Sequence, residues 1–234
     1  SVTRDGNTIR YQGLEPIDDN MDVVNRVIKL TDDDNRATLS EDSTGSLMLS
    51  DDDGTPGTFE GLLFSKPSKS LTIDLSVIYA GGVFDDGEDR VTIESVDLGT
   101  ADLTVLAETI DVATGAVVTT DGDIRLLAKK TGIKQLEDLG PVNFQSKVAS
   151  VNVGGGATIL GRNVIVRSEA TDKSFTSILG TSELPNELLI DPLIESVTGL
   201  LDLPFKVLFK EADVVVTIHD NATIIASGNV TVES

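Results

Sequence analysis

The sequence predicts an all-β protein, a right-handed parallel β-helix in which short strands stack as the coils of a β-solenoid. The main observation is a unit of three short alternating strands, found at residues 110–126, 151–166 and 216–232. In each unit an alanine opens the second strand four positions after the last apolar residue of the first. A turn that contains glycine then leads to the third strand. One such coil cannot bury its inward apolar row alone, whereas stacked coils can.

The composition limits what the chain can bind. It has 234 residues, with 39 acidic and 18 basic side chains, and a formal net charge of −21. A chain of this length can bury a sizeable core, and such an acidic surface repels nucleic acid and anionic membranes. The absence of cysteine excludes disulfides and thiolate metal sites. No apolar run is long enough to span a membrane, so we expect neither a nucleic-acid partner nor a transmembrane segment.

We expect a single elongated domain over residues 1–234, beginning with coils that have acidic turns over residues 1–98. Strands are predicted near 7–11 and 23–30, and in the second of these Arg26 shares a face with apolar residues. The aspartate and glycine runs between strands are turns, because these residues tolerate left-handed backbone and bond their own main chain. An alternative separates residues 1–98 as part of a pair of β-sandwich modules.

Regular coils are predicted over residues 99–170, followed by a helical excursion over 171–205. Apolar residues recur at helical spacing near 186–201, which predicts an amphipathic helix there. Pro192 splits or kinks this segment. We expect the helix to fold back over the flank or the open end of the stack, and the alternative is a docking or membrane-facing helix.

A terminal coil is predicted over residues 206–234, and it ends at Ser234 without a capping sequence. Open solenoid ends aggregate. We therefore expect the natural chain to continue, so that neighbouring repeats of a larger chain are its nearest partners.

Three stretches of the chain, residues 8–17, 26–33 and 64–73, resemble a repeat found in very large secreted bacterial surface proteins. The later coils resemble the β-helical regions of filamentous-haemagglutinin-type adhesins. The resemblance implies an adhesive or scaffold role outside the cell, and it carries no catalytic residues. The sequence departs from the best-known calcium-binding solenoid repeat, because the run Gly154–Ala157 has glycines but no acid.

Calcium at the acidic turns is the one cofactor that the sequence suggests. Hard cations take several oxygen ligands at once, and clustered carboxylates with turn carbonyls can supply them. The candidate metal ligands are Asp32, Asp34, Asp51, Asp53, Asp85, Asp86, Glu88 and Asp89. No cluster has the EF-hand spacing, and the alternative is that they are solvated turns that keep the protein soluble.

No enzymatic activity is predicted. Basic and aromatic residues are sparse, so no carboxylate pair stands out beside the groups that polysaccharide cleavage needs. His219, the only histidine, has no sequence partners for a metal site, and we expect it to be an exposed corner residue. The Gly154–Gly156 run precedes a strand rather than a helix, which excludes a phosphate-cradling loop.

These observations predict a structural or adhesive segment of a large extracellular bacterial surface protein. It would act as a stiff spacer or adhesive fibre, with calcium as a candidate stabilising ion. The expected location is extracellular or at the cell surface. The expected partners, besides neighbouring repeats, are a cell-surface or matrix polysaccharide or protein. The alternative is a polysaccharide-binding or polysaccharide-cleaving β-helix protein, which a groove lined by basic and aromatic residues would favour.

Overall fold

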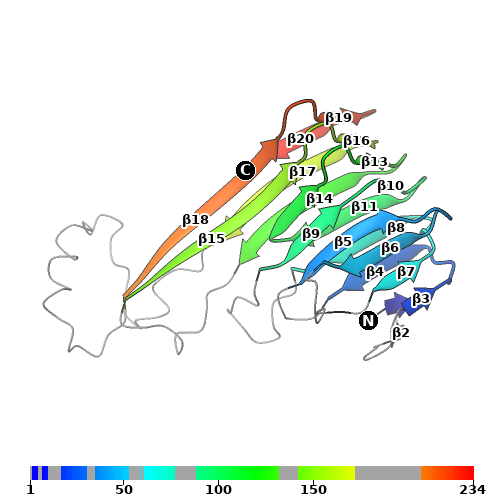
Figure 1. The fold of residues 1–234 in the computed structure, drawn as a ribbon, viewed down its shortest axis with the longest axis horizontal. Coiled ribbons are helices and arrows are strands. Elements are labelled where there is room, and N and C mark those ends of the chain that lie inside the picture. Colours follow the sequence, from blue (N-terminus) through cyan, green and yellow to red (C-terminus); the bar gives the residue numbers. More distant parts are fainter. Residues whose placement is uncertain are drawn as a thin grey trace, which may run out of the picture.

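The computed structural model describes residues 2–4, 7–9, 17–30, 35–52, 59, 61–76, 88–131, 142–171 and 207–234. These residues form strands in three sheets and contain no helix. The prediction of an all-β chain with parallel sheets is confirmed. The helix predicted near 186–201 lies outside the described residues. Figure 1 shows the strands stacked side by side, from β2 and β3 near the N-terminus to β18, β19 and β20 near the C-terminus.

The second half of the chain visits the three sheets in rotation, which is the order that a parallel β-helix requires. Sheet 1 receives β9 (Arg90–Ile93), β12 (Thr109–Val112), β15 (Val142–Val153) and β18 (Val207–Ile218). Sheet 2 receives β10 (Val96–Asp97), β13 (Val117–Thr119), β16 (Thr158–Gly161) and β19 (Thr223–Ala226). Sheet 3 receives β11 (Asp102–Ala107), β14 (Ile124–Thr131), β17 (Val164–Thr171) and β20 (Val230–Glu233). Within each sheet these strands pair in parallel.

The strand register places the three predicted units directly on top of one another. In sheet 1, Val112 pairs with Val153, and Val153 pairs with Ile218. The corner that follows has the same backbone conformation in all three units. Gly115 has a φ of 72°, Gly156 of 71° and Asn221 of 61°. Only glycine and, less readily, asparagine adopt this left-handed region at low cost, so Asn221 replaces glycine in the last unit.

The N-terminal part joins the same sheets but mixes parallel with antiparallel pairs. Its strands are β1 (Val2–Arg4), β2 (Asn7–Ile9), β3 (Ile17–Asp19), β4 (Asn25–Lys29), β5 (Arg36–Glu41), β6 (Leu47–Asp51), β7 (Leu62–Phe64) and β8 (Ser70–Asp74). The pairs β4–β8, β8–β11 and β5–β9 are parallel. The pairs β1–β2, β1–β4, β5–β6 and β6–β7 are antiparallel. Parallel coils alone, as expected for residues 1–98, would not give these pairs.

A tight turn explains one of these antiparallel pairs. Between β5 and β6, the Asp42 carboxylate accepts hydrogen bonds from the backbone amides of Thr44 and Ser46 at 2.8 and 2.9 Å. Gly45 adopts a φ of 85° in the same turn. The Thr44 hydroxyl also donates to Asp42 and, with these amides, lowers the pKa of that carboxyl. A turn this short can join only antiparallel strands, because a parallel pair needs a long crossover.

The core is a column of inward-facing apolar side chains at the centre of the stack. In β11 the buried residues alternate with half-buried ones, as expected for strands with one face turned inward. Leu71, Leu103, Ile124 and Val164 occupy one level of sheet 3, and each is 0 % exposed. At the same level of β4, Arg26 stands where an apolar residue would be expected, next to Leu71.

The Arg26 side chain is buried in the N-terminal part of the stack, on the face that the sequence predicted. Its guanidinium pairs with the buried carboxylate of Asp19 and donates to the backbone oxygen of Met21 at 3.1 Å. It also lies 5.0 Å from the centre of the Phe64 ring. An ion pair and an aromatic face together make it possible to bury this charge.

The connection from sheet 3 to sheet 1 changes length from one coil to the next. Glu108 alone joins β11 to β12, whereas residues 132–141 separate β14 from β15 and residues 172–206 separate β17 from β18. The strands on both sides of the longer connections are also longer, and their register continues without a slip. Among the described residues, no helix is long and apolar enough to cross a membrane.

Candidate functional site

One corner of the stack, where sheet 2 leads into sheet 3, carries a row of aspartate and asparagine side chains. Each member directly precedes a residue of sheet 3 that pairs with its equivalent in the neighbouring coil. These paired residues are Leu103, Ile124, Val164 and Val230. We call this set the corner row, and its members are Asp102, Asp123, Asn163 and Asn229. Because strands of a sheet lie about 4.8 Å apart, side chains at one level can reach the backbone of the next.

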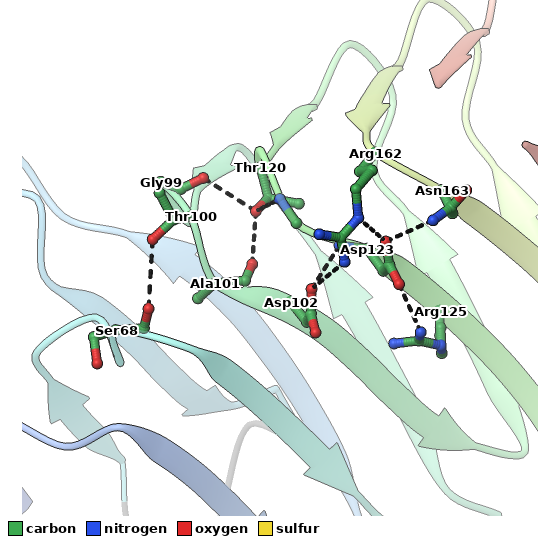
Figure 2. A network of polar contacts seen from close by, with 11 residues as sticks. Ser68, Gly99, Thr100, Ala101, Asp102, Thr120, Asp123, Arg125, Arg162 and Asn163 are labelled. Carbon is green, nitrogen blue, oxygen red and sulfur yellow. Dashed lines mark hydrogen bonds and ion pairs between the residues drawn. The ribbon is translucent and has the colours of Figure 1, made fainter. Parts of the chain in front are cut away.

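Asp123 is the centre of this row, and Figure 2 shows the donors around it. Its Oδ1 accepts hydrogen bonds from Arg162 Nε at 2.7 Å and from Asn163 Nδ2 at 2.9 Å. Its Oδ2 accepts from Arg125 at 2.7 Å. The hydrogen bond from Arg162, helped by Asn163 and by the two guanidinium charges, lowers the pKa of Asp123 to about 2 against the opposing effect of burial. The same contact raises the pKa of Arg162.

The other steps of the row use a different contact, between a side chain and the backbone of the next coil. Asp102 Oδ1 accepts a hydrogen bond from the Asp123 amide at 2.8 Å, and Asn163 Oδ1 accepts one from the Asn229 amide at 3.0 Å. In both cases a glycine, Gly122 or Gly228, directly precedes the residue whose backbone amide donates the hydrogen bond. A Cβ at either position would collide with the accepting side-chain oxygen. The glycines therefore make room for this contact.

A hydroxyl group reinforces the same corner. Thr120 Oγ1 donates to the backbone oxygen of Ala101 at 2.6 Å and accepts from the Gly122 amide at 2.9 Å. Thr120 is buried, so these bonds satisfy polar groups that have little access to water. Figure 2 also shows Thr100 linked to the carbonyl of Ser68, one coil earlier, at 3.4 Å.

A second polar row lies inside the stack, at the corner that leads into sheet 1. It consists of Asn35, Asp89 and Glu108, all buried. Asp89 Oδ1 accepts from the Asn35 amide at 3.0 Å and from Asn35 Nδ2 at 3.4 Å. Glu108 forms an ion pair with the buried Lys130 of β14 at 2.5 Å. Asp89, a candidate calcium ligand in the sequence, thus contributes its carboxylate to a contact between coils.

The other candidate metal ligands have varied positions. Asp51 is half-buried, and its Oδ2 accepts from the backbone amide of Phe59 at 3.0 Å. Glu88 is exposed. The remaining candidates lie outside the described residues: Asp32, Asp34, Asp53, Asp85 and Asp86. In the described part of the chain, no group of three or more His, Cys, Asp or Glu side chains is placed to hold a metal ion.

The outer face of sheet 1 has a shallow groove of about 330 Å³ beside the glycine corner. Asp111 forms its polar centre, where it accepts from Arg90 Nε at 2.6 Å and from Asn152 Nδ2 at 2.8 Å. Gly154 and His219 lie at its margin. His219 is exposed at a corner, as the sequence predicted. Both Asp111 oxygens therefore already accept hydrogen bonds within the structure.

The corner row was not identified from the sequence, although a signal was present. An aspartate or asparagine stands directly before the third strand of every unit, at Asp123, Asn163 and Asn229. The partner Asp102 lies outside the three units, and different chain lengths separate the members. Aligning the units on their third strand would have shown the column.

Comparisons with protein-family models, with curated proteins and with solved structures found no match to this chain. The similarity to surface-protein repeats therefore rests on the sequence stretches alone.

Proposed function

We propose that this chain is a stretch of right-handed parallel β-helix that serves as a stiff spacer or adhesive fibre in a large extracellular bacterial surface protein. The observation that carries the proposal is the continuous register of three sheets whose coils are tied together by the corner row. The contacts of the corner row run along the stack from one coil to the next.

Stacking of this kind favours stiffness. Main-chain hydrogen bonds of three sheets run along the stack, so bending would have to lengthen them on one side. The polar corners add contacts parallel to these ladders, and the apolar column excludes water between coils. The acidic exterior supports the same role, because a net charge of −21 opposes lateral association of extended molecules.

Stiffness can be measured directly because the chain has no cysteine of its own. Spin labels at Met48→Cys and Ile225→Cys, both exposed, report on a long span of the stack. Labels at Met48→Cys and Val117→Cys provide the matched shorter span. A stiff spacer gives distance distributions of similar width for both pairs by pulsed electron resonance. A width that grows strongly with the span would overturn the spacer role.

Calcium stabilisation is a separate part of the proposal, supported by the acidic turns of the first hundred residues. Thermal unfolding with calcium and with a chelator, together with calorimetric titration, tests it. Calcium bound to the folded state alone raises the midpoint in proportion to its affinity. An unchanged midpoint without heat of binding eliminates the calcium site and leaves the spacer role intact. Asp51→Asn serves as the variant, and Asp121→Asn, on a different turn, as its charge-matched control.

A second candidate function is polysaccharide binding without cleavage, which the groove beside Asp111 favours. Its amide, guanidinium and hydroxyl groups match the hydrogen-bonding pattern of sugar hydroxyls, although no Phe, Tyr or Trp ring lines it. Titration with neutral and acidic polysaccharides tests this function. Saturable binding that is lost in Asn152→Ala but kept in Asn163→Ala would support it.

A further inference from the structure

A continuous row of polar side chains runs across the outer face of sheet 1. Its members lie on one face, because residues directly opposite each other in neighbouring strands point the same way. All of them are half-buried, and each has a hydroxyl, amide or carboxylate group that can form hydrogen bonds. We call this set the outer row, and its members, in the order of the strands from β6 to β18, are Ser50, Thr38, Thr92, Asp111, Asn152 and Thr217.

The groove beside the glycine corner lies at the middle of the outer row. Thr92, Asp111 and Asn152 line it, and they come from the neighbouring strands β9, β12 and β15. The groove therefore extends along the stack from coil to coil. Asp111 holds the Arg90 and Asn152 side chains in place by accepting a hydrogen bond from each. A guanidinium and a carboxamide have more hydrogen-bonding sites than these two bonds use, so both groups can also bind a ligand.

The groove has no net charge, although the chain is strongly acidic. The charges of Arg90 and Asp111 cancel in an ion pair at 2.6 Å. The other described lining residues, apart from His219 at the margin, are not ionisable. A chain of net charge −21 repels anions at long range, and an anionic ligand finds no excess of positive charge in the groove to offset this repulsion. The groove therefore favours an uncharged ligand with many hydroxyl groups.

The spacing of the outer row determines the shape of the ligand that fits it. Neighbouring strands lie about 4.8 Å apart, so the row offers one hydrogen-bonding side chain at about this interval along the stack. Each unit of an extended β-linked polysaccharide advances the chain by a similar length, and its hydroxyls stay along a line. A coiled α-linked polysaccharide turns its hydroxyls away from such a row after a few units.

We propose that the outer row binds a neutral, extended β-linked polysaccharide that lies along the stack, with one sugar unit at each coil. The inference rests on the second candidate function, polysaccharide binding at the groove, and gives it a ligand class and a direction. None of the described lining residues is Phe, Tyr or Trp, so no sugar stacks on a ring there. Each unit therefore binds weakly, and the affinity comes from repeating the contact along one ligand.

Titration with oligosaccharides of increasing length, followed by NMR, tests the ligand class. The probes are cello-oligosaccharides of two to six units, with malto-oligosaccharides as the coiled control and β-linked oligomannuronates as the acidic control. The six-unit cello-oligosaccharide should bind about tenfold more tightly than the two-unit one, because it reaches more members of the outer row. Neither control should show this gain with length.

Two isosteric variants test the direction in which the ligand lies. Thr92→Val removes a hydroxyl from the groove and should weaken binding of every cello-oligosaccharide by about threefold to tenfold. Thr38→Val changes the neighbouring strand, outside the groove. It should therefore weaken binding of the six-unit ligand and leave that of the two-unit ligand unchanged. Thr104→Val is the matched control, since Thr104 is also half-buried but lies on β11 in sheet 3.

The possible failures of this inference and of the candidate function differ. Equally tight binding of the acidic or the coiled glycan overturns the inference and leaves polysaccharide binding as a function. So does an affinity that does not rise with length, or a Thr38→Val variant that binds the six-unit ligand as Thr104→Val does. Absence of binding by all three glycans overturns both the inference and the second candidate function. The spacer role is tested by the spin labels and can fail separately.

Discussion

Gly122 lies against Asp102 so closely that a Cβ at residue 122 would come within 2.6 Å of Asp102 Oδ1 and 2.8 Å of its backbone nitrogen. Residue 122 is a glycine because of this close contact and not because of its backbone conformation. Gly228 has the same relation to Asn163. At both steps, a side chain reaches over a glycine to bond the backbone of the next coil.

Gly122→Ala should lower the free energy of unfolding by about 1–3 kcal/mol, because the methyl group displaces the Asp102 carboxylate from the Asp123 amide. Gly61→Ala is the matched control, since its nearest neighbour would lie at 4.0 Å. Urea unfolding measures both. Equal stability of the two variants would show that the close contact at residue 122 relaxes freely.

Asp123→Asn should remove part of the acid sensitivity of the fold. The pKa of Asp123 is about 2 in the folded chain and 3.8 in the reference state. Its contribution to the free energy of unfolding, on the order of 2 kcal/mol, is therefore fully present above the reference pKa of 3.8. It is lost as the pH falls through about 2. The variant should show a flatter decline of stability between about pH 4 and about pH 2. Asp121→Asn, an exposed neighbour, should retain the decline of the unmodified chain.

Glu108→Ala should destabilise the fold by about 3–5 kcal/mol, because it removes the carboxylate that pairs with the buried Lys130 ammonium at 2.5 Å. The double variant Glu108→Leu with Lys130→Met should recover much of this loss, since replacing a buried pair with apolar residues costs little. A double-mutant cycle with the single variants Glu108→Leu and Lys130→Met, followed by thermal unfolding, measures the coupling energy between the two side chains. Lys129→Met, at an exposed neighbouring position, should change stability by less than about 0.5 kcal/mol. Additive losses in the cycle would contradict the pairing.

Asn221→Ala should cost about 1 kcal/mol, because alanine is strained at a φ of 61°. Asn221→Gly should be neutral or slightly stabilising, since glycine already occupies this corner at Gly115 and Gly156. Chemical unfolding of the two variants measures the difference. If alanine and glycine gave the same stability at residue 221, the corner would not retain its left-handed conformation in solution.

Periodicity carried enough information to predict the repeating part of the fold. Ala116, Ala157 and Ala222 aligned the three units, and the strand register agrees with this alignment. Alternation along β4 also predicted the face on which Arg26 lies. These features follow from local chemistry, because a strand with one buried face must alternate.

Contacts between distant parts of the chain could not be predicted in the same way. The β5–β6–β7 pairing depends on which of several acidic turns is tight, and aspartate-rich turns all look alike in sequence. Asp89 is a predicted calcium ligand, and the sequence did not show that its carboxylate also binds Asn35, which lies far away along the chain. Carboxylates that bind cations and carboxylates that bind neighbouring coils have the same sequence signature, so only the register separates them.

The corner between sheet 3 and sheet 1 tolerates connections of very different length, from Glu108 alone to residues 172–206, while the strands on both sides stay in register. Inserting chain at this corner therefore does not disturb the repeat. For protein engineering, this marks a graft point: a peptide epitope or a small domain placed between β14 and β15 would be displayed at a fixed position on the stack. In evolution, the same corner would let loops diversify quickly while the coils around them changed slowly.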